Sequence, residues 1–445
     1  MSRRRNKLPT EPVRATIESL SHEGRGIAHI DGKVVFISRA LPGEEVMFRY
    51  TQRRSKFDLG DTVEVLTPSP QRVEPRCAHF GVCGGCSLQH LGAAEQIAAK
   101  QQRLLENLTH LGKVQPGEIL PPLLAESWGY RRKARLGVHY MRREQLVRVG
   151  FRERSSKFLT DAKRCEVLHP AVGERIEALA ALVNSLSVRD KVPQIEVAIG
   201  DEHAALVFRH MEALTPDDAE KLIAFGKANN LVIYTQSGGP QTIQRIHPAP
   251  TDNGGFYLGY RLPTYDVELQ FQPTDFTQVN AELNRQMIDR AIDMLELNAD
   301  DRVLDLFCGL GNFSLPLARR AGSVVGVEGE ASLVERAAEN ARRNGLDNLE
   351  FHATDLTGDL AAQPWYGQGF NKLLLDPPRS GAAVVVEHLP KPFPERIVYV
   401  SCDPATLARD AGILVNTHGY TLVSAGVMDM FPHTAHVESI ALFVK

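Results

Sequence analysis

Residues 302–313 read RVLDLFCGLGNF, and this stretch decides the fold of the last third of the chain. An apolar run ends at Phe307, and Gly309 and Gly311 separate it from the start of a helix. A tight turn alone would explain these glycines, but they also let the backbone approach a ligand at the helix N-terminus. Further apolar strands are predicted at 323–327, 348–352, 371–375 and 396–401, with helices at 280–297 and 331–344. Strands that alternate with helices predict a doubly wound parallel sheet.

Acidic residues mark the carboxyl ends of these predicted strands. Glu328 ends the strand after the glycine loop, where a carboxylate can accept hydrogen bonds from two ribose hydroxyls. Asp305 opposes a pyrophosphate but suits an ammonium group, and Ser314 replaces the third glycine of a dinucleotide fingerprint. The pattern therefore disfavours a nicotinamide dinucleotide and favours S-adenosylmethionine, which has a ribose, a charged amino group and no phosphate. Asp355 and Asp376 follow two further strands, and a series of helix caps would explain only one of these acids.

Cys402 follows the apolar strand 396–401 and lies on the same edge of the predicted sheet. The N-terminus of the next helix is expected to lower the pKa of its thiol, which makes Cys402 a candidate nucleophile. Cys308, within the glycine loop, fits the structural role that is more usual for a buried cysteine.

A thiolate beside a bound methyl sulfonium suggests one particular chemistry. C5 of uracil is too weak a nucleophile to attack the sulfonium unaided, whereas a thiolate that adds to C6 turns the ring into an enolate. A base must then remove the C5 proton so that the thiolate can leave. The segment 431–438, FPHTAHVE, supplies His433, His436 and Glu438 as candidate bases.

The formal net charge of −3 hides an uneven distribution of charge. Residues 1–60 carry 12 Lys and Arg against 7 Asp and Glu, residues 128–165 carry 12 against 3, and residues 275–445 carry 14 against 23. The second segment contains tight basic runs with aromatic residues interleaved between them. A solvated surface of mixed charge is one explanation, but the runs favour a ligand that offers phosphates and stackable bases, namely RNA.

The first 68 residues form a separate pattern. Short alternating apolar runs between 13 and 66 are separated by turns such as Asp31-Gly32 and Pro42-Gly43. About five such strands predict a small barrel of the oligonucleotide-binding type, with basic side chains on its turns. A Pro-rich run at 67–71 marks its end.

Four cysteines of the first half form an uneven group. Cys77, Cys83 and Cys86 lie close together in the sequence, the last two on a Gly-rich turn, and Cys165 is the remaining cysteine of this half. Four thiolates can hold zinc or an iron–sulfur cluster, although zinc sites usually show two Cys-x2-Cys pairs. Unligated structural cysteines are the third interpretation. A helix with one apolar face is predicted at 93–111, beyond this group.

The composition is that of a folded protein: the 445 residues are 43% hydrophobic and 24% charged, which excludes wholesale disorder. No run of about 18 consecutive apolar residues occurs, so no transmembrane helix is predicted. The N-terminus, MSRRRNKLPTEP, lacks the apolar core of a secretory signal. We therefore expect a cytoplasmic protein that does not contact membranes.

These motifs together resemble the RNA uracil-5 methyltransferase family. The resemblance rests on the glycine loop and on the segments 276–280 (FTQVN), 376–379 (DPPR), 401–410 (SCDPATLARD) and 432–438 (PHTAHVE). It covers nearly the whole chain, and its motifs are specific.

The resemblance implies roles for individual residues. Cys402 is the implied nucleophile, and Glu438 is the implied acceptor of the C5 proton. The residues implied around S-adenosylmethionine are Gln278, Phe307, Asn312, Glu328, Asp355 and Asp376. Asp355 stands where close relatives carry Asn, and an acid there can accept a hydrogen bond from the adenine amino group but cannot also donate one.

The front half resembles particular members of the family. Relatives with this cysteine pattern hold a [4Fe–4S] cluster, which implies ligation by Cys77, Cys83, Cys86 and Cys165. The reaction has no redox step, so the cluster would serve to fold the RNA-binding segment. The N-terminal barrel resembles a TRAM domain, and barrel and cluster together resemble the members that act on 23S ribosomal RNA.

The sequence thus predicts a multidomain enzyme. It comprises a TRAM or OB-like barrel at 1–68, an α+β central domain with the iron–sulfur site at 69–265, and a Rossmann-like class I methyltransferase domain at 266–445. Helix 93–111 is expected to pack on the catalytic domain. The substrate is a uridine in a single-stranded or looped segment of 23S ribosomal RNA, and the enzyme is a monomer. The alternatives are the same chemistry on another ribosomal or transfer RNA uridine, and a non-catalytic iron–sulfur RNA-binding protein.

Overall fold

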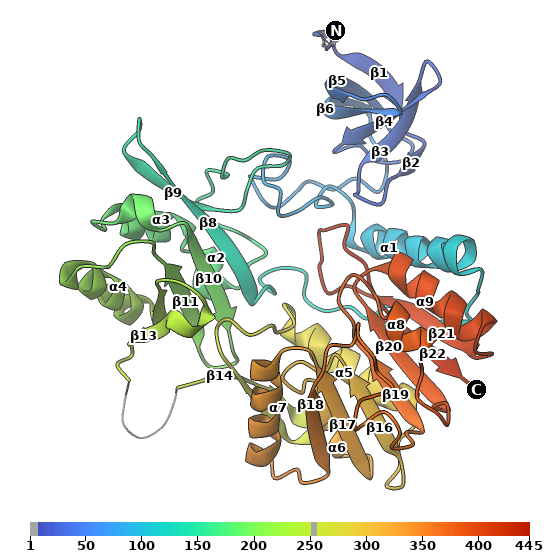
Figure 1. Cartoon of the computed structure of the whole chain (residues 1–445). Coiled ribbons are helices and arrows are strands. Elements are labelled where there is room, and N and C mark those ends of the chain that lie inside the picture. Colours follow the sequence, from blue (N-terminus) through green and yellow to red (C-terminus); the bar gives the residue numbers. More distant parts are fainter. Residues whose placement is uncertain (1–7, 251–255) are drawn as a thin grey trace, which may run out of the picture. The chain divides into compact units, whose positions relative to one another are not determined.

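The computed structural model, drawn in Figure 1, describes residues 8–250 and 256–445. The chain divides into two compact units. Unit 1 contains Met1–Arg103, Phe151–Thr160 and Phe431–His436. Unit 2 contains Leu104–Gly150, Asp161–Met430 and Val437–Lys445. Each unit therefore gathers segments that are far apart in the sequence. Among the described residues, no helix is long and apolar enough to span a bilayer.

The N-terminal part of unit 1 is one curled sheet with the strand order β1-β5-β6-β4-β3-β2 (Figure 1). Its strands are β1 (Val13–Thr16), β2 (Ser19–Leu20), β3 (Gly26–Ile30), β4 (Lys33–Ser38), β5 (Glu45–Arg53) and β6 (Phe57–Thr67). Alternating residues such as Val35, Ile37 and Phe48 are fully buried in its core. Gly60 is required in β6 because a Cβ atom there would lie 2.4 Å from the ring of Phe48. These strands occupy the range in which the sequence predicts the barrel.

The rest of unit 1 is a long loop followed by a helix. The loop carries Cys77, Cys83 and Cys86 and contains only isolated bridges, among them Cys83↔Glu153. Helix α1 (Ala93–Asn107) continues into unit 2 at Leu104 and ends in a π-helical turn, Leu108–Gly112. The predicted helix at 93–111 is thus confirmed, apart from the geometry of its last turn.

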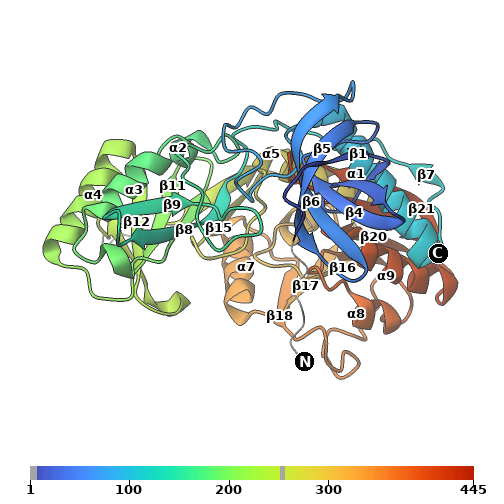
Figure 2. The ribbon, with the colours of Figure 1, turned by 90° about the horizontal axis from the view of Figure 1, so that it is seen from above.

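The central part of unit 2 is a mixed sheet with the strand order β13-β12-β11-β10-β8-β9. Its strands are β8 (Lys133–Met141), β9 (Leu146–Gly150), β10 (Gln194–Ile199), β11 (Ala204–Arg209), β12 (Leu231–Gln236) and β13 (Ile243–His247). Its helices are α2 (Pro170–Gly173), α3 (Ile176–Asn184) and α4 (Pro216–Asn229). Helix α3 packs against β9 and α4 packs against β12 (Figure 2). The hairpin β14 (Leu258–Leu262) and β15 (Val267–Phe271) follows.

The C-terminal part of unit 2 is a sheet with the strand order β18-β17-β16-β19-β20-β22-β21-β7. Its strands are β7 (Glu118–Ile119), β16 (Arg302–Leu306), β17 (Ser323–Glu328), β18 (Leu349–Ala353), β19 (Lys372–Leu375), β20 (Arg396–Ser401), β21 (Thr421–Met428) and β22 (Glu438–Val444). Its helices are α5 (Ala281–Leu295), α6 (Ser314–Ala318), α7 (Ala331–Arg343), α8 (Ala383–Glu387) and α9 (Pro404–Asn416). Strands β16 to β20 pair in parallel and β22 runs antiparallel to β20. The predicted doubly wound sheet is confirmed, and the strand ends lie within a residue or so of those predicted.

Candidate active site

The parallel strands of the large sheet in unit 2 end at one edge. Strand β17 ends at Glu328, β19 ends one residue before Asp376, and β20 ends one residue before Cys402. Ligands of open α/β sheets bind outside the carboxyl ends of the strands. The structure therefore brings Glu328 and Asp376, two of the predicted cofactor residues, and the predicted nucleophile to the same edge.

Asp305 lies within β16, near this edge of the sheet, and is fully buried. The hydroxyl of Ser314 donates to its Oδ2 at 2.5 Å, whereas its Oδ1 has no hydrogen-bond partner. Burial raises the pKa of Asp305 to about 8 against the effect of the Ser314 bond, and the carboxylates of Asp376 and Glu328 raise it further. A buried carboxyl with an unused oxygen fits a cationic ligand group such as the amino group of S-adenosylmethionine.

Glu328 is fixed by three backbone N–H groups. Its Oε2 accepts from Gly309 at 3.1 Å, and its Oε1 accepts from Gly329 at 2.7 Å and from Glu330 at 3.1 Å. A carboxylate has about four acceptor sites, so these bonds orient it and leave one for a ribose hydroxyl.

Two features of the glycine loop fix its geometry: the left-handed backbone of Phe307 and the hydrogen bonds of the Asn312 side chain. Phe307 has a left-handed φ of 66°, which is uncommon for a bulky residue and is found chiefly at functional sites. Asn312 and Asn284 exchange hydrogen bonds at 2.9 and 3.0 Å, and the hydroxyl of Tyr260 donates to Asn312 at 2.7 Å. These bonds fix the Asn312 amide in place beside the loop. Gln278 lies half-buried just before α5.

The two later acids differ in exposure. Asp355 is exposed, and its Oδ1 accepts from the N–H and the hydroxyl of Thr357 at 2.9 and 2.7 Å, which lowers its pKa. Asp355 is therefore an ionised acceptor. Asp376 is half-buried, and burial raises its pKa to about 7.

Cys402 and Glu438 face each other across two antiparallel strands. Ser401 pairs with Ser439 at the end of the β20–β22 ladder. The next residue along each strand places Cys402 opposite Glu438, and the Glu438 carboxylate adds to the effect of burial in raising the pKa of the Cys402 thiol. The predicted nucleophile and the predicted proton acceptor are thus brought together by strand register.

The expectation of a lowered thiol pKa at Cys402 is wrong for the ligand-free chain. Burial raises this pKa to about 12, with further increases from Glu438 and Asp376 and an opposing effect from Arg379. The N-terminus of α9 is already capped by Asp403, which accepts from the N–H of Ala405 at 2.8 Å. The influence of Arg379 was not foreseen, although it lies in the DPPR motif. Cys308 is 4% exposed with a pKa raised well above the usual range, as expected of a structural cysteine.

The loop before Glu438 is anchored by two buried polar residues of α1 that were not predicted from the sequence. Gln96 Oε1 accepts from the N–H of His433 at 2.9 Å, and the ammonium of Lys100 donates to the carbonyl of Phe431 at 3.0 Å. Gln96 is 2% exposed and Lys100 3%. Their spacing of four residues, which places both on one face of the helix, was the available signal. Since His433 supplies backbone contacts here, the structure gives it a role in holding the loop.

Comparisons with known proteins agree with this geometry. Residues 257–445 match the family described as tRNA (Uracil-5-)-methyltransferase, and residues 9–63 match the TRAM domain. The chain is 56% identical to the 23S rRNA (uracil(1939)-C(5))-methyltransferase of Alkalilimnicola ehrlichii, covering 100% of this chain and 99% of the relative. The chain belongs to the RNA uracil-5 methyltransferase family. The corresponding protein of Stenotrophomonas maltophilia strain K279a is 54% identical over 100% of both chains.

A solved structure of this family has the same fold. The Pyrococcus abyssi tRNA (uracil-54, C5)-methyltransferase, in complex with S-adenosyl-L-homocysteine, superposes with a TM-score of 0.74 at 25% identity. The match covers 97% of this chain and 99% of that one. The TRAM barrel and the methyltransferase domain predicted from the sequence are therefore confirmed.

In this family member, three cysteines lie in the loop of unit 1, all partly buried. The N–H of Gly85 donates to Sγ of Cys83 at 3.4 Å, and the N–H of Gly84 donates to the carbonyl of Arg152 at 2.8 Å. Cys165 belongs to unit 2, where its N–H donates to the carbonyl of Gly173 at 2.8 Å. Within 8–250 and 256–445, no group of three or more His, Cys, Asp or Glu residues is arranged to hold a metal ion. The iron–sulfur site stays a prediction.

The basic segment divides into inner and outer cations. Arg132 is ion-paired with Asp201 at 2.6 Å, and the ammonium of Lys133 donates to the carbonyl of Pro273 while burial lowers its pKa to about 8. Arg142 and Arg143 lie in the exposed turn between β8 and β9, and the Arg142 side chain is 83% exposed. The inner cations hold the fold, and the outer pair is accessible to phosphates.

Proposed function

We propose that this chain transfers a methyl group from S-adenosylmethionine to C5 of uridine 1939 in 23S ribosomal RNA. The observation that carries the proposal is the facing pair Cys402 and Glu438 at the edge of a sheet whose buried acid, Asp305, keeps an unused oxygen. The choice of RNA and uridine is supported by full-length similarity to relatives named for that reaction. A ribosomal substrate implies a cytoplasmic enzyme, and we propose that it acts as a monomer.

The chemistry follows from the two facing groups. The Cys402 thiolate adds to C6 of the uracil, and the C5–C6 electron pair moves into an enolate whose nucleophilic carbon is C5. S-adenosylmethionine, when bound, supplies the methyl group that C5 accepts and leaves as S-adenosylhomocysteine. Glu438 then takes the proton from C5, the electron pair restores the C5–C6 double bond, and Cys402 departs as a thiolate.

The cofactor would be held at the sheet edge. Glu328 accepts from the ribose, Asp355 from the adenine amino group, and Asp305 faces the amino group of the methionine part. Gln278, Phe307, Asn312 and Asp376 complete the proposed set. Since burial, together with the carboxylates of Glu438 and Asp376, raises the pKa of Cys402, its thiol is protonated before a ligand binds, and a positive charge at this edge favours the thiolate.

We also infer that Cys77, Cys83, Cys86 and Cys165 hold one [4Fe–4S] cluster. Four thiolates are the donor set that such a cluster requires, and the N–H that Gly85 donates to Cys83 is the kind of bond that stabilises a ligating sulfur. A bound cluster supplies a structural tie, since the reaction includes no change of oxidation state. Zinc is the other metal that this donor set accepts.

The decisive experiment is methylation of a 23S ribosomal RNA fragment that contains uridine 1939. We expect the purified protein to convert this uridine to 5-methyluridine with S-adenosylmethionine and to leave the fragment with cytidine at that position unmodified. Sequencing of total RNA from cells with and without the gene extends the test to every uridine. Methylation of a different uridine would support the proposed chemistry but show that uridine 1939 is not the substrate. Absence of any 5-methyluridine would refute the proposal.

A further inference from the structure

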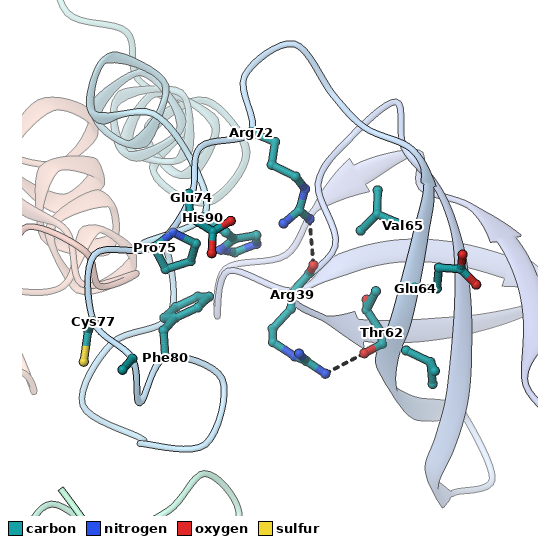
Figure 3. A pocket seen from close by; sticks show the side chains of 12 residues that line it. Arg39, Thr62, Glu64, Val65, Arg72, Glu74, Pro75, Cys77, Phe80 and His90 are labelled. Carbon is teal, nitrogen blue, oxygen red and sulfur yellow. Dashed lines mark hydrogen bonds between the residues drawn. The ribbon is translucent and has the colours of Figure 1, made fainter.

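Unit 1 contains a cavity of about 330 Å³ that the methyl transfer reaction does not use (Figure 3). Residues 62–65 of β6 form one wall, and the other is formed by loop residues, namely Arg72, Glu74, Pro75, Cys77, Ala78, Phe80 and His90. Arg39 lies between the two walls. The volume falls at the lower end of the range of small-molecule sites, which suits a ligand of the size of one nucleotide.

The charges that border this cavity are balanced within the protein. Arg72 donates to both oxygens of the buried carboxylate of Glu44, at 2.5 and 2.8 Å, and to the carbonyl of Arg39 at 2.8 Å. Arg39 in turn forms a two-point ion pair with Asp61, at 2.7 and 3.2 Å. Two further carboxylates, Glu64 and Glu74, line the cavity. Since both guanidinium groups already have carboxylate partners, the cavity suits a neutral ligand better than a phosphate.

His90 is the unexplained group of this cavity. It is 1% exposed, and neither of its ring nitrogens has a hydrogen-bond partner. Burial lowers its pKa to about 3, and Arg72 contributes in the same direction, so the ring is neutral and has one donor and one acceptor unused. Buried polar groups in folded proteins nearly always have partners, so these nitrogens call for a ligand or an ordered water.

Phe80 supplies the flat apolar surface beside His90. The two ring centroids lie 5.2 Å apart with an angle of 34° between the planes. Pro75 lies next to these rings, and Val63 and Val65 lie on the opposite wall. The cavity thus places an aromatic face and a few apolar side chains among polar ones, beside a ring that can both donate and accept, which is the recognition pattern of a nucleobase.

We propose that this cavity takes one unpaired base of the substrate RNA, stacked near Phe80 with its polar edge toward His90. The inference rests on the proposed function, because it needs RNA as the substrate. The base would be a different one from the uridine that Cys402 attacks. Its capture would fix the position of the RNA strand on the TRAM barrel and so contribute to the choice of substrate.

The test combines a protein variant with single abasic nucleotides in the 23S fragment. Phe80→Leu keeps apolar volume but removes the aromatic face, and we expect it to weaken RNA binding about tenfold. The slope of affinity against salt should stay unchanged, since no phosphate contact is lost. One abasic position other than 1939 should weaken binding to the wild type by a similar factor and have no further effect on Phe80→Leu.

The controls separate the possible failures. Phe393→Leu makes the same change at a half-buried ring of unit 2 and should bind RNA like the wild type. Phe80→Leu must retain its metal content and cofactor affinity. If it does not, 5-iodouridine RNA cross-linked to the wild-type protein tests the same contact, with the label expected in the peptide that contains Phe80.

The outcomes are distinct from those of the proposed function. Wild-type methylation of uridine 1939 with no abasic position coupled to Phe80 would overturn the base pocket alone. A reduced salt slope in Phe80→Leu would also overturn it, because the cavity would then serve a phosphate. A wild type that neither binds nor methylates the fragment would refute the proposed function itself.

Discussion

The sheet edge of unit 2 and the cysteine loop of unit 1 both present thiols, but they position them by different means. Cys402 follows a strand that pairs with neighbours on both sides, so the register of β20 and β22 alone puts it opposite Glu438. Cys77, Cys83 and Cys86 lie in a loop whose contacts come from isolated bridges and from the distant segments 151–160 and 431–436. The first arrangement is set by the backbone of one sheet, and the second depends on contacts between segments far apart in the sequence.

The two regions also differ in the electrostatic environment of their charged groups. At the sheet edge, burial raises the pKa of Asp305 to about 8, of Asp376 to about 7 and of Cys402 to about 12. Around the loop cavity, Arg39 and Arg72 are neutralised by carboxylate partners. The edge therefore favours a cationic ligand, and the cavity favours a neutral one.

The largest effects are expected at Cys402 and Glu438, and they should appear at different steps. Cys402→Ala should bind RNA and cofactor but transfer no methyl group, because C5 is never activated. Glu438→Gln should still form the adduct and transfer the methyl group, but slow the loss of the C5 proton by about 10²- to 10⁴-fold. Denaturing gels of protein with labelled RNA measure the trapped adduct.

The matched control for this pair is Cys308→Ala, which removes a buried thiol outside the reaction and should retain activity. Wild-type protein with 5-fluorouridine RNA should give the same trapped adduct, since fluorine replaces the proton to be removed. Appreciable activity in Cys402→Ala would contradict the thiolate mechanism.

The next largest effect concerns the loop. Protein purified without oxygen should contain about four irons per chain. Cys83→Ser should lose this metal and weaken RNA binding by more than it weakens cofactor binding, because the loop and the cofactor edge belong to different units. Metal analysis and calorimetry measure the two quantities. A content of one zinc and no iron per chain would show that the four cysteines bind zinc and not an iron–sulfur cluster.

The contrast between the regions also explains what could be predicted from the sequence. Strands β16, β17, β19 and β20 have largely apolar sequences, so their positions and the residues at their ends could be assigned from local pattern alone. The thiol pKa of Cys402 could not be predicted in this way, because it depends on burial and on Glu438, which lies 36 residues away in the sequence. Gln96 and Lys100 were missed for the same reason: their partners, His433 and Phe431, come from the other end of the chain.

The loop shows the opposite limit. The sequence predicts a metal site from three thiols of this loop and Cys165, but it contains no periodicity from which the path of the loop could be derived. The inner and outer cations of the segment 128–165 were likewise indistinguishable, because Arg132 and Arg142 differ only in the neighbours that the fold provides.

A smaller effect links the cofactor to the nucleophile. S-adenosylmethionine carries a sulfonium charge, so its binding should lower the pKa of Cys402 from about 12 by about one unit or more. Iodoacetamide alkylates the thiolate form, so its rate is proportional to the fraction of Cys402 that is deprotonated. At pH 8, a fall of one unit in the pKa should therefore raise the alkylation rate at Cys402 about tenfold. S-adenosylhomocysteine is the matched control, because it occupies the same site without the sulfonium charge. Equal alkylation rates with the two ligands would contradict the electrostatic account of this edge.

The smallest expected effect is that of the outer cations on RNA affinity. Arg142 and Arg143 lie at the exposed turn of the β8–β9 hairpin, where Arg142 forms a long ion pair with Asp190 at 3.7 Å, so they can contact phosphates with little effect on the fold. Replacing either by Ala should reduce the slope of log affinity against log salt by about 0.7, the value for one phosphate contact in single-stranded RNA. Arg302→Ala is the control, because this exposed arginine begins β16 at the opposite edge of the sheet from Cys402. Binding measured at several salt concentrations decides the matter: an unchanged slope in Arg142→Ala and Arg143→Ala would place the phosphate contacts outside this hairpin.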